Sequence, residues 1–258
     1  MYQTFTNKVL LVLLAILAIP AMVFAQNAEE VARQHVIAKR AAYNLSEADV
    51  SNLIVRDKYL SSKSGITHVY FAQGHNGIEV FNGIINVNVA RDGKVISMGS
   101  RAVPNLATAI KSSSASLTAI QAVQAAASSL NLTVTAPLTV VKTVSPGPSQ
   151  AVEVSKGGIS LETIPARLVY QPMPNGDVRL AWDVAIYQLD AQHWWNMRVD
   201  AASGAILDKN DWVTQCQFDE EPHDHTTHTD SFGPVNTAPA AEETMATSAV
   251  MLSNSPKY

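Results

Sequence analysis

The order of apolar and polar residues in the first half of the chain predicts a helix followed by strands. Residues 27–45 carry apolar side chains at helical spacing, and Asn27 with Glu30 at the third helical position is typical of a capping box. Ser46 indicates a second helical start, which leads into Val50, Leu53 and Ile54. The predicted buried stripe of the first helix consists of Val31, His35, Ala38, Ala42 and Leu45.

Residues 66–99 have the pattern of strands. Gly74–Gly77 has turn composition, and the residues from Ile84 to Val89 alternate, with Ile85, Val87 and Val89 on one face. Asp92-Gly93 then predicts a tight hairpin turn into the strand 94–98.

The second half of the chain repeats this order. Residues 104–116 read as a connector, and Thr118 with Gln121 forms a capping box that starts a helix to Leu130. Its predicted buried stripe is Ile120, Val123, Ala127 and Leu130. Residues 145–148 read as a loop.

Alternating strands follow over 166–212. Their predicted inward residues are Leu180, Trp182, Val184, Ile186, Trp195, Met197 and Val199. A turn at 202–204 separates the last two strands.

These elements predict an α+β fold with two lobes, each a helix packed on an antiparallel sheet. The expected boundaries are a signal peptide at 1–25, a first lobe at 26–105, a second lobe at 106–213 and a flexible linker or tail at 214–258. The hairpins 87–98 and 197–208 occupy equivalent places in the two lobes. Either an internal duplication or the residue pattern that hairpins commonly share accounts for that similarity.

The first 25 residues are typical of a secretory leader. Lys8 precedes an apolar run from Val9 to Ile19, and Val23-Phe24-Ala25 suits cleavage after Ala25. The alternative is an uncleaved anchor, which Pro20 and the short apolar run disfavour. The chain is therefore expected to be secreted, with no membrane contact after the leader is removed.

Composition, net charge and cysteine count limit which partners and which chemistry are expected. The 258 residues are 47% hydrophobic and 16% charged, and the net charge of −4 gives no reason to expect nucleic acid as a partner. Cys216 is the single cysteine, so no disulfide forms within the chain, and an unpaired bystander role is favoured over catalysis.

No catalytic residue emerges from the motifs. None of the seven histidines begins H-E-x-x-H, the helical motif that binds zinc and activates water, and there is no G-x-S-x-G elbow. His223, His225 and His228 form the ligand-like cluster of the chain, but a solvated polar linker is the favoured interpretation, because zinc sites need a rigid frame. Trp194 and Trp195 face opposite sides of a strand, so one is expected in the core and the other partly exposed, at an interface or under a covering element.

Two segments resemble a known family. Residues 68–99, with H-V-Y, G-I-E-V-F and D-G-K-V, are similar to the propeptide module of fungalysin- and thermolysin-type zinc metallopeptidases. Residues 117–130 together with 179–184 and 193–204 are similar to a PepSY-type module. The motif positions that carry the first resemblance are Tyr70, Gly77, Ile78, Val80 and Phe81.

The resemblance implies a prodomain of a secreted fungalysin-type zinc metalloendopeptidase. Such a prodomain assists folding of the catalytic domain and inhibits it, and zinc is expected only in that domain, which this sequence does not contain. The implied partner is the metallopeptidase catalytic domain, in cis or in trans, and no enzymatic activity or cofactor is expected here. The alternatives are a free-standing secreted inhibitor or chaperone, and a PepSY-like binding module of the cell envelope. Of the motif positions themselves, hairpin and core roles are favoured over direct contact with a partner.

Overall fold

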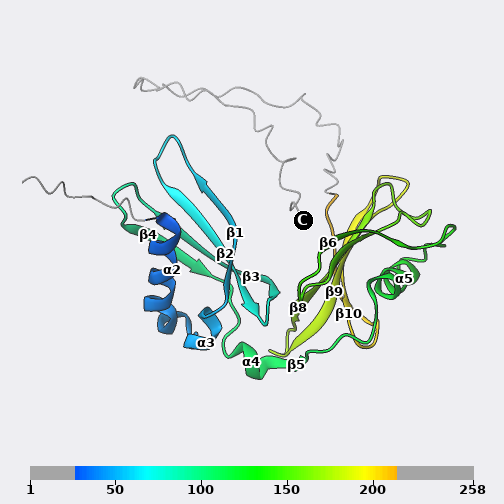
Figure 1. The fold of residues 1–258 in the computed structure, drawn as a ribbon, viewed down its shortest axis with the longest axis horizontal. Coiled ribbons are helices and arrows are strands. Elements are labelled where there is room, and N and C mark those ends of the chain that lie inside the picture. The colour runs from blue at the N-terminus through cyan, green and yellow to red at the C-terminus, as the bar shows by residue number, and fades with distance from the viewer. Residues whose placement is uncertain (1–26, 214–258) are drawn as a thin grey trace, which may run out of the picture. The chain divides into compact units, whose positions relative to one another are not determined.

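A computed structural model describes residues 27–213 of the chain. The described residues up to Trp212 belong to one compact unit of mixed α/β type, with a large sheet and few helices (Figure 1). The main path of the sheet runs β1-β2-β3-β8-β9-β10-β11, with β4 beside β3, β5 beside β9, β7 beside β8, and β6 beside β7. The expected α+β class agrees with this architecture in its coarse form.

The helices within the described residues are short. They are α2 (Ala28–Lys39), the 3-10 helix η1 (Arg40–Tyr43), α3 (Glu47–Val50), α4 (Leu106–Ala109) and α5 (Ala119–Ser129).

The strands supply most of the ordered backbone. They are β1 (Leu53–Leu60), β2 (Thr67–His75), β3 (Ile78–Val89), β4 (Val95–Ser100), β5 (Ile110–Ser112), β6 (Val140–Ser145), β7 (Ala151–Val154), β8 (Ile164–Pro172), β9 (Val178–Tyr187), β10 (Trp194–Asp200) and β11 (Ile206–Asp211).

Helix α2 covers one face of the β1–β4 region (Figure 1). Its contact residues are Ala32 and Val36, both fully buried, which pack with Phe71 and Ile85 in a first apolar cluster. The predicted stripe was right at Leu45, which is buried in this cluster, but within α2 it was wrong by about one position, since Ala38 is exposed and Val31 only half-buried. A helix of twelve residues with several small side chains gives too weak a periodicity to fix its rotation.

The ends of α2 also differ from the sequence prediction. Asn27 does cap the helix, but it accepts from the amide of Glu29 at 3.2 Å, while the carboxylate of Glu30 accepts from Gln34. The α-helix ends at Lys39, a 3-10 turn follows, and Asn44 reverses the chain with a φ of +58°. Asn is one of the few residues that adopts this left-handed conformation readily.

The second start, at Ser46, is confirmed by a capping box with Asp49. The helix it begins has only four residues, and Leu53 and Ile54 lie in β1, a strand that the sequence pattern did not indicate. Strand β1 forms because it pairs along its length with β2, with a bulge between Val55 and Asp57. Pairing with the neighbouring strand overrides the local helical pattern.

Helix α5 packs on the β8–β10 region over a second, larger apolar cluster (Figure 1). Its capping box between Thr118 and Gln121 is confirmed. The buried residues of the helix are Ala119, Ala122, Val123, Ala126 and Ala127, so the predicted stripe was right at Val123 and Ala127 only; Ile120 and Leu130 are partly buried at its margin. Alanine dominates the contact face, which lets the helix approach the sheet closely.

Most of the inward residues predicted for the last strands are confirmed. Leu180, Trp182, Val184 and Ile186 of β9 and Met197 and Val199 of β10 belong to the second cluster, with Trp195 packed against it. The hairpin turns at Asp92-Gly93 and at 202–204 are present. Strands β6 and β7 were not predicted, and the connector 104–116 contains α4 and β5.

Asp49 ties the first half to the connector. Its carboxylate accepts from the amide of Ser46, the hydroxyl of Ser46, and the amides of Asn105 and Leu106, at 2.8–2.9 Å. Burial alone would raise the pKa of Asp49, but these hydrogen bonds, first among them that from Leu106, lower it below the usual value.

Replacing Asp49 by Asn should therefore destabilise the fold by about 2–3 kcal/mol at pH 7. A lowered pKa means that the contribution is present above the unfolded-state pKa and disappears as the pH falls through the folded-state pKa. Urea unfolding of both proteins should show a stability gap at pH 7 that narrows as the pH falls below the unfolded-state pKa of about 3.9 and through the lowered folded-state pKa. A gap that stays constant with pH would contradict the role assigned to the carboxylate; Asp57→Asn, at an exposed position of β1, serves as the control.

Candidate functional site

The motif residues lie on the β2–β3 hairpin. Asn76 and Gly77 form its turn with φ values of +50° and +77°, and His75 pairs directly with Ile78. Two successive positive φ values are typical of the two-residue turn that suits the twist of a hairpin. The predicted turn is thus confirmed, and it places Gly77, Ile78, Val80 and Phe81 together at the start of β3.

Strand β3 contributes to both apolar clusters. Ile78 and Val80 are buried in the second cluster, whereas Ile85 and Val87 are buried in the first. The strand passes from one cluster to the other at Asn82, whose φ is +56°, and at the buried Gly83, where a β-carbon would lie 2.9 Å from Val80. The motif segment therefore leaves the face that α2 covers and enters the core beneath α5.

The tip of the hairpin packs against the second half of the sheet. A β-carbon built on Gly77 would lie 2.9 Å from Cγ of Pro148, in the loop between β6 and β7. The ring of His75 meets Tyr170 of β8 edge-on, with centroids 5.8 Å apart. Val80 is paired in parallel with Tyr170, which is the backbone link between β3 and β8.

Glu79 is the charged residue at the centre of this contact between the β2–β3 hairpin and β8, which is called the joint below. Its Oε2 accepts from Arg56 of β1 at 2.8 Å and from Arg167 of β8 at 2.7 Å. Arg167 also lies 3.5 Å from the buried carboxylate of Asp183 on β9. One carboxylate thus connects strands that are more than eighty residues apart in sequence.

A buried arginine extends the network along β10. The side chain of Arg198 is fully buried and donates to Asn196 and to Asp208, with Asp183 at 3.9 Å. The ring of Phe81 covers its guanidinium at 4.1 Å from the centroid. A buried cation of this kind is tolerable only because carboxylates and an aromatic face replace its hydration.

The network is close to neutral. It joins the arginines 56, 167 and 198 with the carboxylates Glu79, Asp183 and Asp208. Arg198 and Asp183 are buried, so removing the opposite charges beside either one leaves a buried charge without compensation, which costs more than the pair contributes when it is intact. The motif hairpin is thereby held in one position on the second half of the sheet.

Tyr70 stands apart from the joint, on the face of β2 opposite α2. It shares a hydrogen bond with Tyr59, which together with burial raises the pKa of the Tyr70 hydroxyl. Tyr59 also stacks on His68 at 4.8 Å, and His68 bonds Asn88 at 2.7 Å. The ring of Tyr70 also stacks on that of Tyr59, whose side chain is 48% exposed, with centroids 6.1 Å apart.

The tryptophans of β10 follow the prediction in part. Trp195 faces the core, while Trp194 stacks on Tyr187 at 5.0 Å and meets Trp212 edge-on at 5.3 Å. Both are only half-buried. The outward tryptophan is thus covered by aromatic neighbours within the chain.

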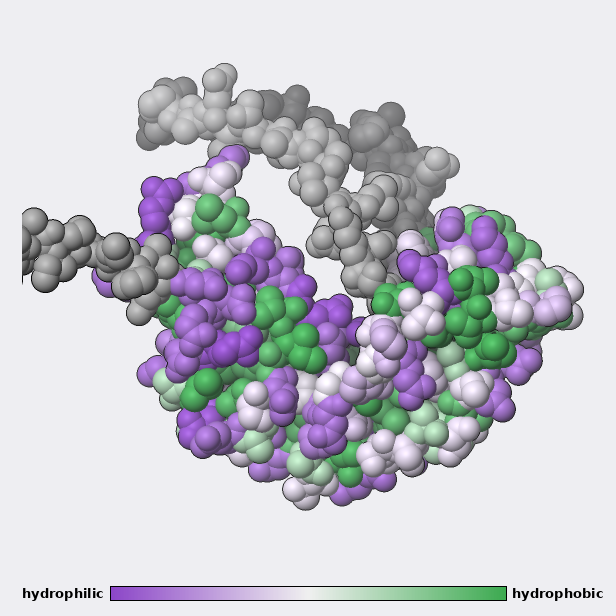
Figure 2. Space-filling view, in the orientation of Figure 1, coloured by the Kyte–Doolittle hydropathy of each residue, from purple (hydrophilic) through white to green (hydrophobic). Residues whose placement is uncertain are grey.

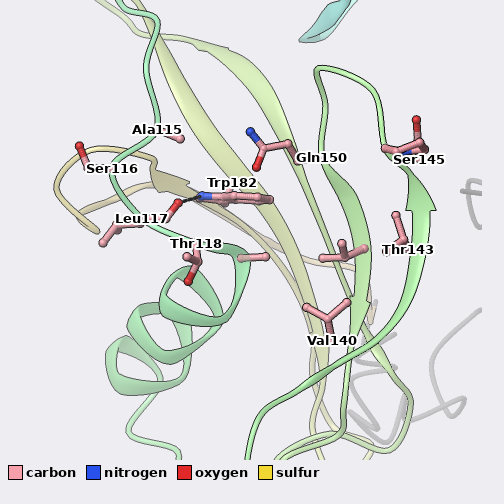
Figure 3. Close-up of a pocket in the computed structure, with 12 residues that line it drawn as sticks. Ala115, Ser116, Leu117, Thr118, Val140, Thr143, Ser145, Gln150 and Trp182 are labelled. Carbon is pink, nitrogen blue, oxygen red and sulfur yellow. Dashed lines mark hydrogen bonds between the residues drawn. The ribbon is translucent and has the colours of Figure 1, made fainter.

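An open groove lies between the start of α5 and the β6–β7 hairpin (Figure 3). Its volume is about 430 Å³, and its walls are the segment 115–119 on one side and Val140 and Thr143 of β6 on the other. Trp182 forms the floor and donates from its indole nitrogen to the carbonyl of Leu117 at 3.0 Å. Figure 2 shows hydrophobic residues on the surface of this part of the molecule.

No group of three or more His, Cys, Asp or Glu within 27–213 is placed to hold a metal ion. His223, His225, His228, Cys216 and the cleavage position Ala25 all lie outside the described residues. No helix of the described part is long and apolar enough to cross a membrane.

The sequence pattern did not indicate which residues the motif segment contacts. Arg167, Arg198 and Pro148 carry no local pattern that marks them, and the alternation of β10 suggested that Arg198 faces solvent. The available signal was Glu79, a charge placed between two apolar residues that are both buried. Such a charge needs a cationic partner, but the sequence does not say which one.

Comparisons with known proteins agree with the placement of the motif. Residues 51–102 match the family model described as the Fungalysin/Thermolysin Propeptide Motif. This range contains Tyr70, Gly77, Ile78, Val80 and Phe81.

Several secreted fungal proteins are similar to the chain. Extracellular metalloproteinase 2 of Phaeosphaeria nodorum is 37% identical over 153 residues, which is 58% of this chain and 23% of the relative. Extracellular metalloproteinase mep of Aspergillus fumigatus is 31% identical over 202 residues, or 75% of this chain and 29% of the relative. The chain therefore spans about a quarter of the length of the curated relatives it matches.

Among solved structures, the C-terminal domain of YpeB from Bacillus megaterium aligns with 72% of this chain and 64% of its own, at 10% identity and a TM-score of 0.32. That similarity is too low to support an argument about fold or function.

The contact of Gly77 with Pro148 can be measured by a mutant cycle. Gly93→Ala, at a φ of +81° with open space around it, should cost only the backbone strain of about 1 kcal/mol. Gly77→Ala adds the clash with Pro148 and should cost about 2–3 kcal/mol. Pro148→Ala in the Gly77→Ala background should recover about 1 kcal/mol in urea unfolding. Equal costs at the two glycines would show that the hairpin tip does not press on Pro148.

The central carboxylate gives a second prediction. Glu79→Gln should destabilise the protein by about 3 kcal/mol, because Arg56 and Arg167 lose a shared acceptor. Glu47→Gln is the matched control; its pair with Arg40 is 3.7 Å long and largely exposed, so it should cost less than about 1 kcal/mol. Denaturation midpoints for the two variants that coincide would refute the assignment of Glu79.

Proposed function

We propose that this chain, whose residues 51–102 carry the fungalysin/thermolysin propeptide motif, acts as the prodomain of a secreted fungalysin-type zinc metallopeptidase. In this role it assists folding of the catalytic domain and blocks its cleft until the prodomain is cut away. The similarity over the propeptide motif and beyond it to extracellular metalloproteinases is the observation that carries the proposal.

The physical properties of the motif region support this role. A prodomain must present a fixed surface to its partner, because binding that favours one conformation of the partner adds to the stability of that conformation. The joint around Glu79 holds the motif hairpin against β8 and β10. The motif residues then act by fixing the shape of the prodomain, and other surfaces meet the partner.

The domain organisation is part of the proposal. A first lobe at 26–105 and a second, PepSY-like lobe at 106–213 would each consist of a helix on an antiparallel sheet, and the two apolar clusters support that division. Ile78 and Val80 are the exception, since they come from the first lobe and enter the second cluster. Residues 1–25 would be the leader that directs secretion, cleaved after Ala25.

Zinc belongs to the catalytic domain in this account. Its ligands would be supplied there by H-E-x-x-H, a motif that no histidine of this sequence begins. The partner is that domain, tethered in cis or bound in trans. A tether raises the effective concentration of the prodomain, so weak contacts suffice for inhibition in cis.

The function can be tested with residues 26–258 and the catalytic domain of the Phaeosphaeria nodorum relative, expressed without its own propeptide. The chain should inhibit hydrolysis of a casein substrate at micromolar concentration, and it should increase the activity recovered when the denatured catalytic domain is refolded. Trypsin serves as the specificity control and should be unaffected. Neither inhibition nor improved refolding, with a correctly folded chain, would contradict the proposal.

A further inference from the structure

Strand β6 leaves one backbone edge open. In the part of the chain that the structure describes, it pairs with β7 alone, from Val140 to Ser145. The amide and carbonyl groups on its outer side therefore have no partner strand. An edge of this kind is a template on which another strand can add.

The edge of β6 carries fewer of the charges that usually prevent such pairing than the other long edges of the sheet. Its sequence V-V-K-T-V-S contains one charged residue, Lys142, whose ammonium lies 2.8 Å from Glu153 of β7. Val140 and Val141 are 46% and 53% exposed. The edge strands β1 and β11, in contrast, carry Arg-Asp-Lys at 56–58 and Asp-Lys-Asn-Asp at 208–211.

The groove in front of Trp182 lies beside this same strand. Val140, Thr143 and Ser145 of β6 line it together with Val152 of β7, and none of the residues that line it is titratable (Figure 3). A strand added beside β6 would point alternate side chains toward the groove. The absence of charge in the lining matches uncharged side chains and disfavours charged ones.

These observations fit a recognition mode in which main-chain hydrogen bonds give affinity and pockets for alternate side chains give specificity. We propose that β6 is the docking edge for an extended, uncharged strand of the metallopeptidase catalytic domain, which lays its inward side chains over the Trp182 groove. This inference rests on the proposed function and names the surface through which the prodomain meets its partner.

A charge on the edge tests the inference without touching the core. Val141→Lys places an ammonium on the exposed outer strand, a device that natural edges use to prevent pairing. Ile96→Lys is the matched control, because Ile96 is 57% exposed on β4, an edge strand of the other part of the sheet. Circular dichroism and urea unfolding establish that both variants fold.

Inhibition of the Phaeosphaeria nodorum catalytic domain is then compared among the three proteins. The inhibition constant should rise at least tenfold for Val141→Lys and stay within twofold of the unaltered protein for Ile96→Lys. Hydrogen exchange with a catalytic domain whose motif glutamate is changed to Gln, so that it does not cut, should show protection of the β6 amides on binding.

Each other outcome overturns the inference. An unchanged inhibition constant for Val141→Lys, or unprotected β6 amides in an inhibited complex, rules out β6 as the docking edge but does not contradict the prodomain function. Sedimentation that reveals a dimer abolished by Val141→Lys identifies a second copy of this chain as the occupant instead. If the unaltered protein does not inhibit the catalytic domain, the result contradicts both the proposed function and the docking role of β6.

Discussion

The position of the segment Ile78–Phe81 is the constraint on which the rest of the structure depends. Two of its side chains, Ile78 and Val80, are buried beneath α5, although the strand continues into the cluster that α2 covers. Glu79 and Phe81 point to the other side, where they meet Arg167 and Arg198. The same four residues therefore complete an apolar core on one face and a charged network on the other.

This arrangement explains why an acidic residue stands among apolar ones at positions 78–81 of this chain. Hydrophobic burial of Ile78 and Val80 is non-directional and would tolerate some sliding. The carboxylate of Glu79, which receives hydrogen bonds from Arg56 and Arg167, removes that freedom because it bonds donors on two strands at once. Residues in a motif can thus determine how the scaffold presents its outer surfaces, such as the β6 edge, without contacting a partner themselves.

The sequence predicted local features well where one short signal was sufficient. The helical start at Ser46, the capping box at Thr118, the Asn76-Gly77 turn and the alternation of β9 could all be predicted, because each depends on neighbours within a few residues. Strands β1, β6 and β7 were missed although each pairs with the next strand along the chain. Strands β1 and β6 are exposed over most of their length, so their residues carry no alternation of apolar and polar positions. The contact between Glu79 and Arg167 could not be predicted because the two residues are 88 positions apart, and nothing local to either indicates the other.

Native-state hydrogen exchange tests most directly whether the motif hairpin couples the two apolar clusters into one unit. The account predicts that the amides of Val87, in the first cluster, and Val184, in the second, exchange only through global unfolding, with the same opening free energy and the same dependence on denaturant. A first cluster that opens at markedly lower free energy while the second stays protected would contradict it.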